Sequence, residues 1–127
     1  MTGGQDGSGK SLDSAEILDD VADASFRALV ATMASRRADH QVVPLPSGQV
    51  LVIGGEDDPG DGSGDVILQA VDVFEPGAET FTALPPLATP RDDHRAVRLR
   101  DGRVLVTGGE NTTSTASIAD AETYDAK

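Results

Sequence analysis

The sequence contains no cysteine and no tryptophan, and aromatic residues make up only 3% of its 127 positions. The lack of cysteine excludes a disulfide framework and thiol chemistry. With so few aromatic residues, the core must be built mainly from Val, Leu, Ile and Ala. No apolar run approaches the roughly 20 residues that a membrane-spanning helix needs, and the opening residues do not resemble a signal peptide. We therefore expect no membrane insertion.

Positive charge is also scarce, because 10 basic residues face 22 acidic ones and the net charge is −12. A surface this negative repels phosphate backbones, so nucleic acids and anionic membranes are poor partners. Cations and basic protein surfaces are better ones. Acidity also serves solubility alone, so charge restricts the partner class without identifying a partner.

An internal repeat is the main feature that the sequence does contain. Residues 37–56 and 91–110 are identical at 12 of 20 positions with a shift of 54 and no gap. The repeat continues upstream, where residues 16–18 match 72–74 and residues 26–29 match 81–84. A third copy of the piece at 16–18 and 72–74 lies near the end of the chain, at 121–124.

Each copy predicts four short strands separated by turn residues. The later copy gives the first and second strands, at 94–99 and 103–107, and the middle copy gives the third and fourth, at 67–74 and 80–84. A period near fifty residues with four strands is typical of a β-propeller blade. We predict an all-β chain with a partial blade at 1–38, a complete blade at 39–92 and a partial blade at 93–127.

One segment favours a different structure. Within residues 14–35, apolar side chains recur at spacings of three and four, a pattern that predicts an amphipathic helix. The matching segment 72–91 carries Pro76, Gly77, Pro85, Pro86 and Pro90, so it cannot form one helix. Since copies of one repeat share a fold, we predict strands in both segments.

The repeated motif resembles that of the bacterial kelch family, whose propellers include the central domain of galactose oxidase. It consists of Arg-x-x-His, an apolar strand, Asp-Gly or Ser-Gly, Val-Leu-Val, Gly-Gly and an acidic-aromatic strand. The resemblance covers nearly the whole chain and implies a kelch-type propeller of four-stranded blades. Bacterial proteins of this type are often exported, so it also implies an exported or cell-surface location.

Recurrence indicates that several motif residues maintain each blade rather than bind a ligand. The glycine pairs permit a sharp turn and close approach of the backbone, and the Arg and His side chains can bond loop carbonyls. The residues predicted to be structural are Arg37, His40, Gly54, Gly55, His94, Gly108 and Gly109.

The copies are incomplete at both ends. Residues 1–4 align with 106–109, and the chain stops after Tyr124, before a fourth strand. Closed propellers have about four to eight blades. We therefore expect either a piece of a longer protein or a short subunit that assembles with others, so that its partners include further blades or copies of itself.

Residues 4–11, Gly-Gln-Asp-Gly-Ser-Gly-Lys-Ser, satisfy the phosphate-loop pattern. In a true phosphate loop the backbone N–H groups surround phosphates and Lys10 neutralises their charge. The confirming context is a buried strand before the loop, and only three residues precede Gly4. The repeat instead predicts a connection between strands here, which leaves nucleotide binding as an alternative function.

An acidic, glycine-rich loop follows the first glycine pair. Its spacing fails the EF-hand pattern, since Pro59 stands at the third position from Asp57, and we expect no metal and no cofactor. In a four-stranded blade this loop and the connection to the next blade emerge at the same end. The predicted partner-binding residues are therefore Asp57, Asp58, Asp61, Asp65, Arg91 and Asp92.

Loops on a rigid scaffold are where recognition concentrates. We predict a binding module for a protein or carbohydrate ligand. The alternative is a structural portion of a larger exported oxidase or carbohydrate-active enzyme. Catalysis like that of galactose oxidase requires copper and a cysteine-linked tyrosine, whereas this chain has no cysteine and a single tyrosine, Tyr124. We expect no catalytic residues in this chain.

Overall fold

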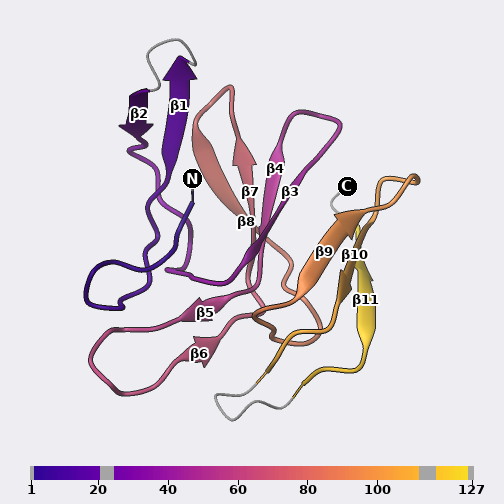
Figure 1. Cartoon of the computed structure of the whole chain (residues 1–127). Helices are drawn as coiled ribbons and strands as arrows, with labels where there is room; N and C mark the ends of the chain where they lie inside the picture. The colour runs from indigo at the N-terminus through magenta and orange to yellow at the C-terminus, as the bar shows by residue number, and fades with distance from the viewer. Residues whose placement is uncertain (1, 21–24, 112–116, 126–127) are drawn as a thin grey trace.

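The computed structural model describes residues 2–20, 25–111 and 117–125. This part of the chain contains no helix, and its eleven strands pair only in antiparallel fashion. The prediction of an all-β chain is confirmed at this level. The strands form separate sheets that follow one another along the sequence, from indigo through magenta to yellow (Figure 1).

The central sheet has four strands in sequence order, β3-β4-β7-β8, and the C-terminal sheet has three, β9-β10-β11. A two-stranded sheet, β1-β2, precedes them, and a small β5-β6 hairpin extends from the central sheet. The bounds are β1 Glu16–Asp20, β2 Ser25–Ala28, β3 Gln41–Pro44, β4 Val50–Ile53, β5 Glu56–Asp57, β6 Val66–Ile67, β7 Val71–Glu75, β8 Thr80–Leu84, β9 Arg95–Arg98, β10 Val104–Thr107 and β11 Ala121–Tyr124.

The segment with helical periodicity forms strands β1 and β2. Leu18 lies opposite Phe26 in their antiparallel register. The next residue along, Ile17, packs on the opposite side, against the cluster around Phe74. Apolar side chains therefore occur on both faces of this sheet, which produces a spacing that imitates a helix. The choice of strands over a helix is confirmed for the described residues of 14–35.

The prediction of one continuous third strand at 67–74 is wrong in its first part. The structure divides it, because Val66–Ile67 pairs with Glu56–Asp57 and the sheet strand begins only at Val71. Between them the backbone bonds outside the sheet: the Leu68 carbonyl accepts the Arg91 N–H at 3.1 Å, and the Gln69 carbonyl accepts the Leu87 N–H at 2.8 Å. These bonds tie the loop to the connection that leads into β9.

The two larger sheets repeat one register. Val50 pairs with Phe74 in the central sheet, and Val104 pairs with Tyr124 in the C-terminal sheet. The first residues of these pairs are 54 positions apart (104 − 50) and the second are 50 apart (124 − 74). The later copy therefore shortens its connection by four residues and keeps the pairing.

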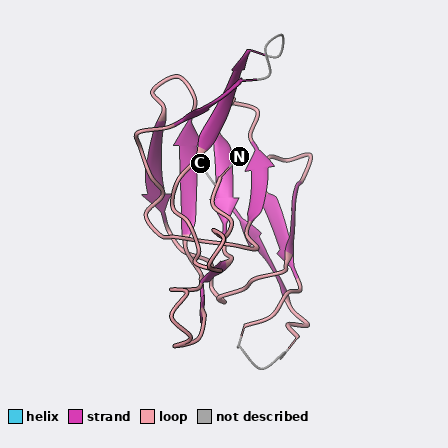
Figure 2. Cartoon of the chain, turned by 60° about the vertical axis from the view of Figure 1, so that its left-hand side comes forward, coloured by secondary structure: helices cyan, strands magenta, loops and turns pink. Residues whose placement is uncertain are grey.

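The sheets stack face to face around two apolar clusters, and Figure 2 shows the layers from the side. One cluster joins Leu51 and Ile53 of β4 to Val104 and Val106 of β10. The other joins Phe74 of β7 to Ala15 and Leu29 beside β1 and β2. Because neighbouring residues of β4 point to opposite faces, this strand of the central sheet is buried from both sides.

Candidate functional site

Two connections gather at one end of the stacked sheets. The loop before β1 and the β5-β6 hairpin lie at the lower end of Figure 1, opposite the turns that join β3 to β4 and β7 to β8. This is the arrangement expected when antiparallel strands alternate in direction. We call the carboxylates at this lower end the acidic loop end; they are Asp39, Glu56, Asp57, Asp58, Asp61, Asp65, Asp92 and Glu110.

The two connections contact one another. The Ser11 N–H donates to the Asp58 carbonyl at 2.8 Å, and the Asp58 N–H donates to Ser11 Oγ at 3.0 Å. The buried Ser11 hydroxyl also donates to the Glu56 carbonyl at 3.3 Å. The loop before β1 therefore packs against the base of the β5-β6 hairpin and holds it in place.

Glu56 lies at the electrostatic centre of this end. Partial burial raises its pKa to about 7, and the negative charges of Asp65, Asp39, Asp92 and Asp58 add to the effect. Burial also raises the pKa of Asp92, with further contributions from Asp93, Glu110 and Asp39. Carboxylates from several loops thus share one anionic region, which favours a cationic partner.

Four of the six predicted partner-binding residues lie in or beside the hairpin. Asp57 forms an ion pair with Arg36, with Oδ1 3.1 Å from Nε. The Asp58 carboxylate accepts the Gly60 N–H at 2.7 Å, and the exposed Asp61 accepts the Ser63 N–H at 2.9 Å. The negative charge of Asp65 contributes to the raised pKa of Glu56. These acceptor bonds fix the turns of the loop and leave it strongly negative.

The other two predicted residues have different environments. Asp92 is half-buried and its backbone pairs with Glu110 at 3.0–3.1 Å. Arg91 is fully buried: its guanidinium donates to the Gly108 carbonyl at 2.8 Å and forms ion pairs at 3.0 Å with Asp120 and Glu122. Because Arg91 is inaccessible, it does not belong to the exposed binding surface.

Arg37 occupies the same position one repeat earlier. It is fully buried, donates to the carbonyls of Gly54 and Ala70 at 3.1 Å, and forms an ion pair with the buried Asp72 at 2.5 Å. Glu122 is the counterpart of Asp72, since each pairs with the equivalent valine of its sheet. The repeated arginine thus joins the end of one strand to the next in both copies, which is a structural role.

The two histidines lie against glycines of the preceding repeat. A Cβ on Gly3 would be 2.9 Å from His40 Cε1, and one on Gly54 would be 2.8 Å from His94 Cε1. Burial and a nearby arginine, Arg37 and Arg91 respectively, lower both pKa values to about 4. The histidines are therefore neutral packing groups at the junctions between repeats.

Each glycine of the pair Gly54-Gly55 has a separate neighbour. A Cβ on Gly54 would be 2.5 Å from the Arg91 carbonyl of the following repeat, whereas one on Gly55 would collide with the Ala38 carbonyl of its own. Both adopt positive φ, which glycine tolerates. In the next repeat, a Cβ on Gly109 would collide with the Asp92 carbonyl, as one on Gly55 would with that of Ala38. A Cβ on Gly108, the counterpart of Gly54, would have no atom within 4 Å.

The segment with the phosphate-loop pattern forms a closed turn. Asp6 Oδ1 accepts the backbone N–H groups of Ser8 and Lys10 at 2.8 and 3.1 Å. The Ser11 N–H is committed to the Asp58 carbonyl, and the chain continues into strand β1 rather than a helix. Most of the backbone donors that a phosphate would need are therefore already used, which disfavours nucleotide binding.

Sequence reasoning did not single out Asp39, Glu56 and Glu110 as members of the acidic end. Their recurrence was the available signal, because Asp39 matches Asp93 and Glu56 matches Glu110 at a shift of 54. In both copies these residues lie at or beside an equivalent backbone pair, Ala38 with Glu56 and Asp92 with Glu110. The repeat therefore places acidic residues beside each pairing.

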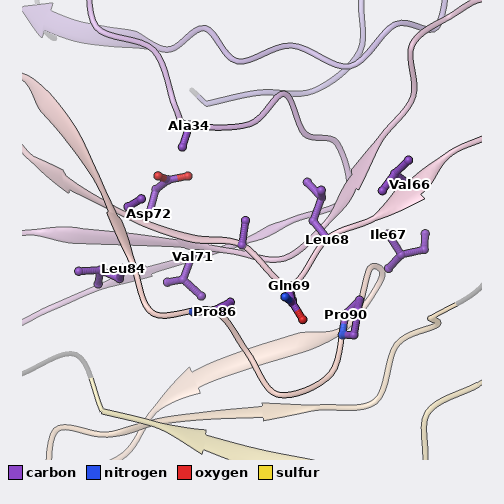
Figure 3. A pocket seen from close by; sticks show the side chains of 12 residues that line it. Ala34, Val66, Ile67, Leu68, Gln69, Val71, Asp72, Leu84, Pro86 and Pro90 are labelled. Atoms are coloured by element: carbon purple, nitrogen blue, oxygen red, sulfur yellow. The ribbon is translucent and has the colours of Figure 1, made fainter.

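A separate groove of about 530 Å³ lies beside the central sheet, between β6, β7, β8 and the segment before Arg36 (Figure 3). Its lining is almost entirely apolar and includes Val66, Leu68, Leu84, Pro86 and Pro90. Asp72 is its one charged lining residue, and that carboxylate is held by Arg37. The groove therefore offers no reactive group.

A scan against protein-family models and a search of curated proteins found no match to this chain. Within the described ranges, no helix is long and apolar enough to cross a membrane. Nor do the described histidines and carboxylates include a group of three or more arranged to hold a metal ion. The loop geometry and its charge are therefore the basis for assigning a function.

Proposed function

We propose that the chain is a segment of a kelch-type β-propeller and acts as a binding module through its acidic loop end. Three observations support the architecture: the repeat of about fifty residues, the four-stranded meander β3-β4-β7-β8, and the stacking of consecutive sheets face to face. In this architecture the β5-β6 hairpin joins the second and third strands of one blade.

The partner class is a basic protein segment. The observation that carries this choice is the environment of Glu56: partial burial raises its pKa to about 7, and the charges of neighbouring carboxylates add to the effect. A lysine or arginine side chain placed there relieves the repulsion among Glu56, Asp65 and Asp58. An uncharged carbohydrate would leave that repulsion in place, so charge favours the protein ligand.

The test is titration with a fluorescent decalysine peptide at low and at raised salt. The variant Asp58→Asn/Asp61→Asn removes two charges from the acidic loop end, and asparagine can still accept the Gly60 and Ser63 N–H bonds. The matched control, Glu75→Gln/Asp101→Asn, removes two charges from turn residues at the opposite end. Both variants have the same net charge.

We expect the loop variant to weaken peptide binding several-fold and the control to leave it nearly unchanged. Raised salt should weaken binding by the wild type, because exposed charges are screened beyond about 10 Å at 0.1 M. Equal weakening by both variants would mean that the peptide responds only to net charge. That result would remove the acidic loop end as the site.

A further inference from the structure

Strand β4 of the central sheet is covered on both faces, whereas its counterpart β10 is covered on one. Leu51, Val52 and Ile53 of β4 are fully buried, with Leu51 and Ile53 packed toward the C-terminal sheet. Their counterparts in β10, Leu105 and Thr107, point away from the central sheet and are only half-buried. The outer face of β10 is thus equivalent to the face of β4 that the C-terminal sheet covers, but no further sheet packs on it among the described residues.

Strand β9 contributes to this uncovered surface. Val97 pairs with Leu105 across the two strands and is 56% exposed. Its counterpart in the central sheet, Val43, is 4% exposed because the next sheet packs over it. We call Val97 and Leu105, with Thr107, the trailing face.

The first sheet has an uncovered surface of the opposite kind. Leu18 and Phe26 lie opposite one another on β1 and β2 and are 41% and 57% exposed. They point away from the central sheet, since the neighbouring Ile17 packs toward it. We call Leu18 and Phe26 the leading face.

The counterparts of the leading face pack against the preceding repeat, where one is buried and the other is partly buried. Leu18 and Phe26 correspond to Phe74 and Phe81, whose rings lie 4.8 Å apart and pack against Ala15 and Leu29 of the preceding repeat. In the third repeat, Leu18 corresponds to Tyr124, which belongs to the same cluster as Leu51. At the junction between the central and C-terminal sheets, the leading counterpart Tyr124 therefore shares one apolar cluster with the trailing counterparts Val43, Leu51 and Ile53.

We propose that the trailing face of one molecule packs on the leading face of a second copy of this chain, head to tail. Each copy carries both complementary surfaces, and their internal counterparts already form this type of junction between the central and C-terminal sheets. Leu18 of the second copy takes the place next to Leu105 that Tyr124 takes next to Leu51. Such a contact joins two different surfaces, so it leads to a ring or an open chain of copies.

Charge opposes this association, because each copy carries −12. Screening by salt therefore strengthens the head-to-tail contact, which depends on apolar packing. Salt has the opposite effect on binding of a basic peptide at the acidic loop end. The two proposals are independent, and the sign of the salt response distinguishes them.

Sedimentation velocity of the whole chain over a concentration series, at low and high salt, tests the proposal. Phe26→Asp blocks the leading face and Val97→Asp blocks the trailing face; both positions are exposed, so both variants should fold. The control is Val30→Asp, because Val30 is fully exposed and lies in neither face. Circular dichroism verifies that all three variants keep the wild-type fold.

We expect the wild type and Val30→Asp to associate alike, and each face variant alone to associate at least tenfold more weakly. Mixing Phe26→Asp with Val97→Asp should restore association and stop it at one-to-one dimers, since only one intact junction can form. A monomeric wild type at every concentration and salt would overturn the proposal. So would an associating wild type whose two face variants stay monomeric when mixed.

Discussion

Arg37 and Asp72 form a fully buried ion pair, with Nη2 2.5 Å from Oδ2, at the point where one repeat passes into the next. The guanidinium also donates to the carbonyl of Gly54, which follows β4, and to that of Ala70, which precedes β7. The pair therefore links the end of β4 to the start of β7, next to the acidic loop end, and stabilises that end of the central sheet.

Removing one member of this pair should be severely destabilising. Asp72→Ala leaves the guanidinium buried without its counter-charge, which costs about 3–5 kcal/mol. Glu122→Ala, at the equivalent position of the third repeat, should cost less because Asp120 still neutralises Arg91. Urea denaturation measures both. Equal losses for the two variants would contradict the assigned role of Asp120.

Exposed ion pairs provide the reference for that experiment. Arg103 and Asp101 form an exposed pair at 2.7 Å in the turn between β9 and β10. Because solvent screens such pairs, Arg103→Ala should leave the denaturation midpoint almost unchanged.

Two glycines with nearly the same backbone conformation should respond differently to alanine. Gly54 and Gly108 have φ of 60° and 64°, so each substitution incurs the left-handed penalty of about 1 kcal/mol. Only at Gly54 does the new Cβ meet a backbone carbonyl, that of Arg91 at 2.5 Å. Overpacking there should add about 1–3 kcal/mol.

Thermal or urea unfolding of Gly54→Ala and Gly108→Ala compares the two costs directly. Similar losses for both variants would show that the third repeat does not pack over the second at Gly54 as described.

Acid should destabilise the fold through His94. Burial, with Arg91 nearby, lowers its folded pKa to about 4 from 6.5. The unfolded chain therefore binds the proton first, and stability is lost as pH falls from about 6.5 to about 4. The loss attributable to His94 is at most about 3 kcal/mol. His94→Phe should reduce the slope of unfolding free energy in this range, and an unchanged slope would contradict the burial.

Glu56 should act in the opposite direction. Its folded pKa of about 7 lies above its ordinary value of 4.5, so the folded state binds the proton first and loses stability as pH rises from about 4.5 through about 7. Glu56→Gln should therefore stabilise the chain at pH 8 more than at pH 5. Chemical denaturation at the two pH values measures this, and no difference would mean that the carboxylates around Glu56 are not crowded.

The repeat made most of the fold predictable, because its period and turn residues distinguish strands from a helix even where the spacing in 14–35 favours a helix. The interruption at 68–70 was not predictable, since those residues continue the apolar pattern while their backbone bonds to distant loops. The burial of Arg91 was also missed as part of the binding prediction. Its place in a connecting loop suggested exposure, and only the acidic partners on β11 and just before it explain why it turns inward.

For the acidic loop end, the sequence predicted Asp92 and the aspartates of one loop, but not Asp39, Glu56 and Glu110. Asp39, Glu56 and Asp92 are separated along the chain, and only the stacking of sheets brings their charges together. A long-range electrostatic contact of this kind carries no local sequence signal beyond the recurrence of the residues.

The central claim is that consecutive repeats form sheets that stack in chain order. Methyl NOE spectroscopy tests it most directly, with selective labelling of Leu, Ile and Val. The account predicts contacts from Leu51 and Ile53 to Val104 and Val106, together with extended-strand patterns in 16–20 and 25–28. The absence of those contacts, or a helical pattern running through 14–35, would contradict it.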